Sequence, residues 1–147
     1  TKYDNVLYDS LEEQHAMTLQ DTFVRLGMAE VGNKIRVANL SMPELEERLL
    51  KRQSERIVII DSAQYTRWRV KDFFEFRNKF PKKLFVFTSH AKGNDPRGEL
   101  ANEIMYNADL KIWVEGYKAF SKGRYVGETG EYTIYKKGAE EYWGNQL

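Results

Sequence analysis

The sequence has no cysteine among its 147 residues and only two histidines. A disulfide framework and a thiolate metal site are therefore excluded. His15 and His90 are too far apart in the sequence to show the spacing of metal ligands, so no zinc site is expected. The absence of cysteine fits a reducing compartment.

Long hydrophobic runs and an excess of one charge are also missing. The longest apolar runs, such as residues 57–60, are far too short to cross a bilayer, and no basic-then-apolar leader opens the sequence. We therefore expect a cytoplasmic protein without a membrane partner. The formal net charge is +1, so any contact with nucleic acid must come from a local patch.

Short apolar runs alternate with segments of helical spacing, which predicts an α/β fold. Strands are predicted near residues 5–9, 34–38, 56–60, 84–88 and 110–114, all in one mostly parallel sheet. Helices are predicted over residues 12–26, 43–50, 70–80 and 100–106, the second capped by Ser41 and Glu44. Two further strand-like runs around residues 123–130 predict a C-terminal antiparallel hairpin. The continuous apolar runs 57–60 and 84–87 predict strands buried on both faces.

Polar side chains cluster where the predicted strands end. Ser10 and Glu12 follow the first strand, while Asp61 follows the third. In parallel α/β sheets, ligands bind beyond the carboxyl ends of the strands. Further polar residues at these ends are Glu13, Ser62, Gln64, Thr88, Ser89 and His90.

Three stretches together resemble the RecA-like ATPases, in particular DnaB-type replicative helicases and RadA-type repair ATPases. Residues 6–13 (Val-Leu-Tyr-Asp-Ser-Leu-Glu-Glu) resemble the strand that ends in the catalytic glutamate. Residues 57–64 (Ile-Val-Ile-Ile-Asp-Ser-Ala-Gln) are similar to the Walker B strand, and residues 121–130 to the hairpin that carries a lysine-x-arginine pair. Residues 87–90 look like the strand with the polar sensor residue, and the order of all four agrees with the family.

The resemblance implies a three-layer RecA-like fold over residues 1–147, lacking the strand and helix of the phosphate-binding loop. It implies Mg²⁺-dependent ATP hydrolysis in a helicase or recombination and repair ATPase. The partners it implies are single-stranded DNA and further copies of the chain, in a ring or a filament. The residue roles it implies are a catalytic Glu12 and His90, nucleotide contacts from Ser62 and Gln64, Mg²⁺ held by Asp61, and a finger of Lys122 and Arg124 serving a neighbouring subunit.

One departure from the family is that no Gly-x-x-x-x-Gly-Lys-Ser/Thr loop occurs in the sequence. That loop holds the phosphates through its backbone N–H groups and its lysine. Two explanations stay open: the chain is part of a longer ATPase, or it is a degenerate relative that kept the fold. The chain alone is expected to be inactive, and a non-catalytic oligomerisation or DNA-binding module is the alternative function.

Each candidate residue also has a purely structural interpretation. Glu12, with Glu13 in reserve, is also what the first turn of a helix favours. Asp61 is an ordinary residue to end a buried strand, and His90 a possible loop histidine without a partner.

The basic and aromatic candidates have such alternatives too. Lys92, Arg97, Lys111 and Lys118 are candidates for contacts with DNA phosphates. Lys92 and Arg97 lie in the loop that would face DNA, and they are also normal for a solvated loop. Lys122 and Arg124 suit an edge strand that avoids unwanted pairing. Tyr65 and Trp68 would either stack on bases or cover the core.

Overall fold

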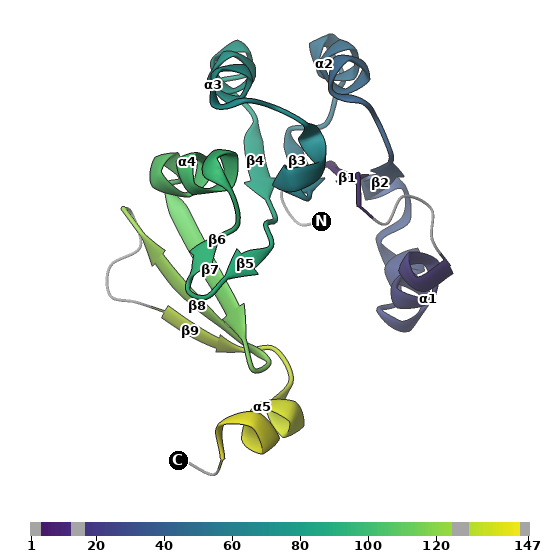
Figure 1. Cartoon of the computed structure of the whole chain (residues 1–147). Helices are drawn as coiled ribbons and strands as arrows, with labels where there is room; N and C mark the ends of the chain where they lie inside the picture. Colours follow the sequence, from purple (N-terminus) through teal and green to yellow (C-terminus); the bar gives the residue numbers. More distant parts are fainter. Residues whose placement is uncertain (1–3, 13–16, 125–129, 145–147) are drawn as a thin grey trace. The chain divides into compact units, whose positions relative to one another are not determined.

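A computed structural model describes residues 4–12, 17–124 and 130–144 (Figure 1). The chain divides into two compact units, Thr1–Ile104 and Met105–Leu147. The first unit contains a parallel sheet with helices, and the second an antiparallel sheet followed by a helix. The predicted α/β class with a C-terminal antiparallel hairpin is therefore confirmed.

The sheet of the first unit has four strands in the order β2-β1-β3-β4, and every neighbouring pair is parallel. The strands are β1 (Val6–Ser10), β2 (Ile35–Ala38), β3 (Ile57–Asp61) and β4 (Leu84–Phe87). The expected neighbourhood of β3 and β4 is confirmed by a register that pairs Ile57 with Leu84 and Ile60 with Phe87. The carboxyl ends of β1, β3 and β4 consequently lie at one edge of the sheet.

Helices connect these strands. They are α1 (Met17–Arg25), the 3-10 helix η1 (Met28–Lys34), α2 (Met42–Leu50), the 3-10 helix η2 (Ala63–Thr66), α3 (Val70–Lys79) and α4 (Glu99–Asn107). The predicted cap of α2 is present, because the Ser41 backbone N–H donates to the Glu44 carboxylate over 2.8 Å. Pro81 follows α3 closely, as expected for a residue that cannot continue a helix.

The main core lies between one face of the sheet and the helices α2 and α3. Leu7, Val58 and Ile60 of the sheet are fully buried and pack with Leu45 of α2 and Phe76 of α3. Trp68 joins this core, with its ring centroid 4.6 Å from that of Phe76. The interpretation of Trp68 as a core residue is therefore confirmed.

The opposite face of the sheet is less covered than the sequence predicts. Ile57 and Ile59 are half-buried, while Leu84 and Val86 of β4 are 58% and 41% exposed. The prediction that β4 is buried on both faces is therefore wrong. The reason lies in the sheet order, which makes β4 an edge strand paired with β3 alone among the described residues.

The second unit holds β7 (Leu110–Glu115), β8 (Lys118–Gly123), β9 (Gly130–Thr133) and α5 (Lys136–Trp143). Its strands form a separate antiparallel sheet, so the prediction that residues 110–114 join the parallel sheet is wrong. The two-residue turn Gly116–Tyr117 explains this, since both residues have positive φ, 52° and 62°. Such a turn matches the twist of a tight hairpin and folds β8 back onto β7.

A short two-stranded ladder, β5 (Ala91–Lys92) with β6 (Asp95–Pro96), follows β4 in the first unit. Gly93 in its turn has φ 64°, a conformation that glycine adopts without strain. Over the parts of the chain that the structure describes, no helix is both long and apolar enough to span a membrane.

Candidate functional site

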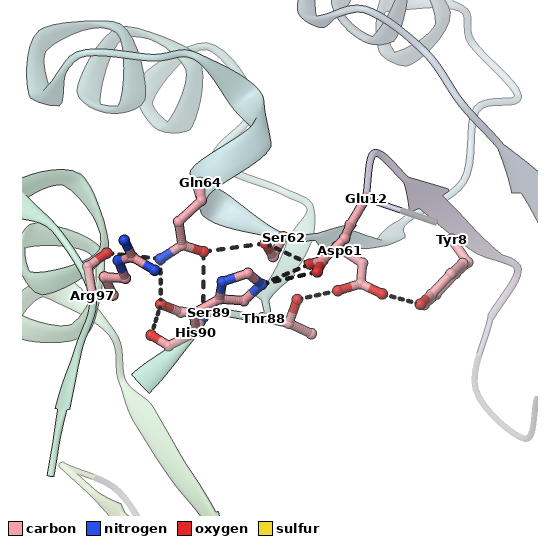
Figure 2. A network of polar contacts seen from close by, with 9 residues as sticks. All are labelled: Tyr8, Glu12, Asp61, Ser62, Gln64, Thr88, Ser89, His90 and Arg97. Carbon is pink, nitrogen blue, oxygen red and sulfur yellow. Dashed lines mark hydrogen bonds and ion pairs between the residues drawn. The ribbon is translucent and has the colours of Figure 1, made fainter. Parts of the chain in front are cut away.

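The turn that follows β1 is attached to the end of β3 by backbone hydrogen bonds. The N–H groups of Leu11 and Glu12 both donate to the carbonyl of Asp61, over 2.7 and 3.1 Å. On the other side, the Ala63 N–H donates to the Thr88 carbonyl over 2.9 Å. These bonds hold the residues after three neighbouring strands together. Their polar side chains form two hydrogen-bonded groups, one around Asp61 and one around Glu12, His90 and Gln64 (Figure 2).

Asp61 lies at the centre of this edge and accepts from two hydroxyl groups. Tyr8 donates to Oδ2 and Thr88 donates to Oδ1. The peptide bond between Asp61 and Ser62 is cis. Because a carboxylate has about four lone-pair positions, both oxygens can still bind a hard cation.

Glu12 and His90 form a direct pair across the same edge. His90 Nε2 lies 3.0 and 2.9 Å from the two carboxylate oxygens of Glu12. Their side chains are 33% and 39% exposed, so solvent or a ligand can reach both. The alternative of His90 as a loop histidine without a partner is therefore wrong.

Gln64 connects this pair to the start of the β5–β6 ladder. Its amide nitrogen donates to Ser89 Oγ over 2.9 Å and to the Arg97 carbonyl over 2.7 Å. Its amide oxygen accepts from the His90 N–H over 3.3 Å. The amide of one residue therefore holds the segment after β4 against the turn after β3, as Figure 2 shows.

The hydroxyl of Ser62, which is buried, lies between Glu12 and Gln64. Ser62 Oγ is 3.2 Å from Glu12 Oε2 and 3.1 Å from Gln64 Oε1. Since a hydroxyl has one proton, it donates to only one of these acceptors at a time. Ser62 is thus able to switch between the carboxylate and the amide.

Asp9 lies next to this edge but faces the core. Its side chain is fully buried, Oδ1 accepts from the Leu40 N–H over 2.8 Å, and Oδ2 has no hydrogen-bond partner in the described structure. Burial raises the pKa of Asp9 from 3.8 to about 6, although the Leu40 N–H and the charge of Arg48 act in the opposite direction.

The structure brings together Glu12, Asp61, Ser62, Gln64 and His90 of the predicted site residues. Glu13 lies outside the described residues. The sequence interpretation missed Tyr8, whose alternation with Ser10 places it on the face of β1 next to Asp61. For Thr88 and Ser89 the sequence predicts only a position at a strand end.

Lys92 and Arg97, the loop residues expected to contact DNA, lie around the β5–β6 ladder, and both are exposed. Lys92 pairs in register with the acidic residue Asp95. Arg97 contributes its backbone, because its N–H donates to the His90 carbonyl over 2.7 Å and its carbonyl accepts from Gln64. The side chains of both therefore lie in solvent, at the base of a short ladder tied to the site.

Lys122 and Arg124 belong to the second unit. Lys122 lies in β8, and Arg124 follows that strand with its N–H donating to the Asp109 carbonyl over 3.0 Å. Residues 125–129 of the predicted hairpin lie outside the described residues.

The oxygen-rich edge suits a magnesium ion better than a softer metal. Within the described ranges, no group of three or more histidines or acidic residues could hold a metal ion. A cation at Asp61 would therefore take most of its ligands from water or from a bound molecule, which is the usual coordination of Mg²⁺. Comparisons with protein families, with curated proteins and with solved structures gave no match.

Proposed function

We propose that the chain is part of an ATP-dependent, DNA-processing ATPase of the RecA-like type. The observation that supports this most is the meeting of Glu12, Asp61 and His90 at the carboxyl edge of three neighbouring parallel strands. A carboxylate for water, a carboxylate for a metal ion and a polar group for phosphate are the parts that phosphoryl transfer to water requires.

Glu12 is the general base in this proposal. It lies two residues beyond the end of β1, and its carboxylate is partly exposed and pairs with His90. A carboxylate at a rigid strand end can orient an attacking water and accept its proton. His90 positions Glu12 and contacts the terminal phosphate of the substrate.

Asp61 would hold Mg²⁺, with Tyr8 and Thr88 fixing the orientation of its carboxylate. A bound Mg²⁺ neutralises charge on the phosphate oxygens of ATP. Gln64 contacts the nucleotide, and the buried Ser62 supports that contact through its hydrogen bond to the Gln64 amide oxygen. The amide nitrogen of Gln64 links the contact to the β5–β6 ladder and thus to Lys92 and Arg97. DNA, single-stranded in this proposal, is the partner of that ladder.

Lys122 and Arg124 act on the ATP of a neighbouring copy in a ring or a filament. They are two residues apart, so on an extended backbone they point to the same side. Arginine suits this role because its planar fork makes two bonds to one phosphate group. The oligomer is therefore part of the proposal, since each site needs a finger from another copy.

The missing phosphate-binding loop favours a second candidate, a non-catalytic oligomerisation or DNA-binding module. The two candidates differ in one measurement. The 147-residue chain alone should show no steady ATP turnover under either, because the loop supplies most of the triphosphate binding. A longer form that carries the loop should turn over ATP only if the first candidate is correct.

The roles are tested in such a loop-bearing form. Glu12→Gln should lower kcat by about 10²–10⁴ while ATP binding is retained, because only the proton acceptor is lost. Glu75→Gln, an exposed carboxylate of α3 paired with Lys71, is the matched control and should leave turnover unchanged. Normal turnover in Glu12→Gln would contradict the assignment of the base.

The finger is tested separately. Arg124→Ala should lower turnover by about 10³ or more with ATP binding nearly intact. Mixing Arg124→Ala with Asp61→Ala should restore part of the activity, since a mixed oligomer can combine an intact site with an intact finger. No recovery in mixed oligomers that demonstrably form would show that the finger does not act between copies.

A further inference from the structure

Two lysines lie directly opposite each other in the sheet of the second unit. Lys111 of β7 pairs in register with Lys122 of β8. Side chains at such positions have Cβ atoms about 4.5–5.5 Å apart, and like charges there destabilise the sheet. Neither lysine forms an ion pair or a side-chain hydrogen bond with another described residue.

The other charged side chains on the same face of the sheet have hydrogen-bond or ion-pair partners. By strand alternation, this face also carries Glu115 and Lys118. Glu115 accepts from Trp113 Nε1 and from the Tyr142 hydroxyl, each over 3.0 Å, and Lys118 pairs with Glu131 over 2.6 Å. Among the residues that the structure describes, Lys111 and Lys122 are therefore the charged side chains of this face that have no partner.

Helix α5 covers only the satisfied end. Trp143 packs edge-on against Phe120 with 6.0 Å between ring centroids, and its Nε1 donates to the Gly116 carbonyl. Lys122 is exposed and Lys111 half-buried. A small anion from solvent can therefore reach both lysines.

Gly123 precedes Arg124, which is a third basic residue at this end of the sheet. A Cβ atom there would lie 2.5 Å from the Asp109 carbonyl oxygen, so only glycine permits this close approach of the strands. The approach lets the Arg124 N–H donate to that carbonyl, which extends the pairing by one residue. Arg124 thus occupies an exposed position directly after β8, two residues beyond Lys122, and Asp109 opposite forms no ion pair with a described residue.

We propose that Lys111, Lys122 and Arg124 form a phosphate-binding surface, in which Lys111 adds a cation to the lysine-x-arginine pair. A phosphate oxygen between the two lysines would turn their repulsion into two charge-assisted hydrogen bonds. Arg124 adds a planar fork for a second oxygen. The evidence for this surface is the register of β7 on β8 in the second unit. Only the source of the phosphate, a nucleotide or nucleic acid, rests on the proposed function.

The test uses the 147-residue chain and pyrophosphate, followed by backbone amide chemical shifts in NMR spectra. We expect the shifts to concentrate at residues 110–112 and 121–124 and the affinity to fall by about tenfold in Lys111→Gln, the loss of one charge-assisted contact. Lys136→Gln on α5, which removes an exposed lysine paired with Glu140, should bind as the unchanged protein does. The melting temperature of Lys111→Gln should not fall, because a repulsion is removed.

Equal pyrophosphate affinity in Lys111→Gln and Lys136→Gln would overturn the inference, and so would shifts that avoid both strand ends. The source of the phosphate follows from two further titrations, with ATP and with a short single-stranded oligodeoxynucleotide. A nucleic-acid source predicts a salt dependence whose slope falls by about 1 in Lys111→Gln. A nucleotide source predicts that ATP displaces the oligonucleotide.

Failure of this inference can be told from failure of the ATPase role. Pyrophosphate binding that depends on Lys111, without ATP turnover in a loop-bearing form, would overturn the ATPase and keep the surface. If ATP turnover depends on Arg124 but Lys111→Gln leaves the pyrophosphate affinity unchanged, this inference alone is overturned.

Discussion

The two ends of β3 carry carboxylates in opposite situations. Glu55 precedes the strand, its side chain is only 4% exposed, and Arg48 binds it through two nitrogens over 3.1 and 2.6 Å. Asp61 ends the strand, and its carboxylate accepts from the hydroxyl groups of Tyr8 and Thr88, beside the exposed pair of Glu12 and His90. The amino end thus has a closed ion pair, while the carboxyl end has polar groups that can exchange their partners for a ligand.

The two ends of β3 therefore differ in what their carboxylates contribute, stability at the amino end and accessible reactive groups at the carboxyl end. A buried carboxylate needs its counter-charge, because without it the desolvation of the charge is not compensated. Exposed polar pairs contribute little to folding. We therefore expect the amino end to determine stability and the carboxyl end to be nearly neutral to it.

The largest expected effect comes from breaking the closed pair. Arg48→Met should lower the free energy of unfolding by about 3–5 kcal/mol, because Glu55 then stays buried and keeps, among the described residues, the ion pair with Arg36 at 3.5 Å. Urea denaturation at neutral pH measures this, with Lys71→Met, from the exposed pair with Glu75, as the control within about 0.5 kcal/mol. Similar losses in both variants would show that the pair is not what stabilises this end.

Acid should also lower the free energy of unfolding through the Arg48–Glu55 pair. The hydrogen bond from Arg48 lowers the pKa of Glu55 below 4.5. The stability that results is therefore present above pH 4.5 and is lost as the pH falls through the folded pKa. Arg48→Met should lack that part of the acid destabilisation.

A smaller effect, with the opposite dependence on pH, should come from Asp9. Its folded pKa, about 6, lies above the ordinary 3.8, so the folded state binds the proton more tightly. Wild-type stability should therefore fall as the pH rises from about 4 to about 6, whereas Asp9→Asn has no proton to lose. The advantage of Asp9→Asn over wild type should grow by up to about 3 kcal/mol over that interval.

Urea denaturation of both proteins at several pH values measures this difference. Asp21→Asn, at an exposed position of α1, should follow the wild type throughout. A constant gap between Asp9→Asn and the wild type would mean that Asp9 titrates normally in the folded protein.

The smallest effect is expected at the exposed pair. His90→Ala and Glu12→Gln should each change the free energy of unfolding by no more than about 0.5–1 kcal/mol, because both side chains are partly solvated. Thermal unfolding of the two variants measures this. A loss as large as that of Arg48→Met would make the Glu12–His90 pair structural and remove the contrast between the two ends.

Local patterns in the sequence predicted most of the secondary structure. The apolar runs placed β1, β3 and β4 to within about two residues, and the Ser41 and Glu44 pattern located the start of α2. They did not predict α5, whose residues 136–143 include Gly138 and lack a clear start signal. The sequence predicted a helix correctly where hydrophobic periodicity and a capping pattern indicated the same start.

The candidate site was predictable in part for the same reason. Strand ends are readable from the sequence, so Glu12, Asp61 and His90 could be selected as residues at one edge. The partners of Asp61 could not, because Tyr8 and Thr88 reach it only through the register of β1 and β4 on β3. The hydrogen bond from Tyr8 to Asp61 joins residues 53 positions apart, and no local pattern encodes the register that brings them together.

The sequence by itself determined most of the segments that form strands, most of those that form helices, and which polar residues follow the strands. Only the tertiary structure decided that β4 is an edge strand with Leu84 and Val86 exposed, and that β7 turns back onto β8. It also decided that Lys111 faces Lys122. The physical reason is that alternation and capping act between near neighbours in the chain, whereas strand order is chosen by hydrogen bonds and burial between distant ones.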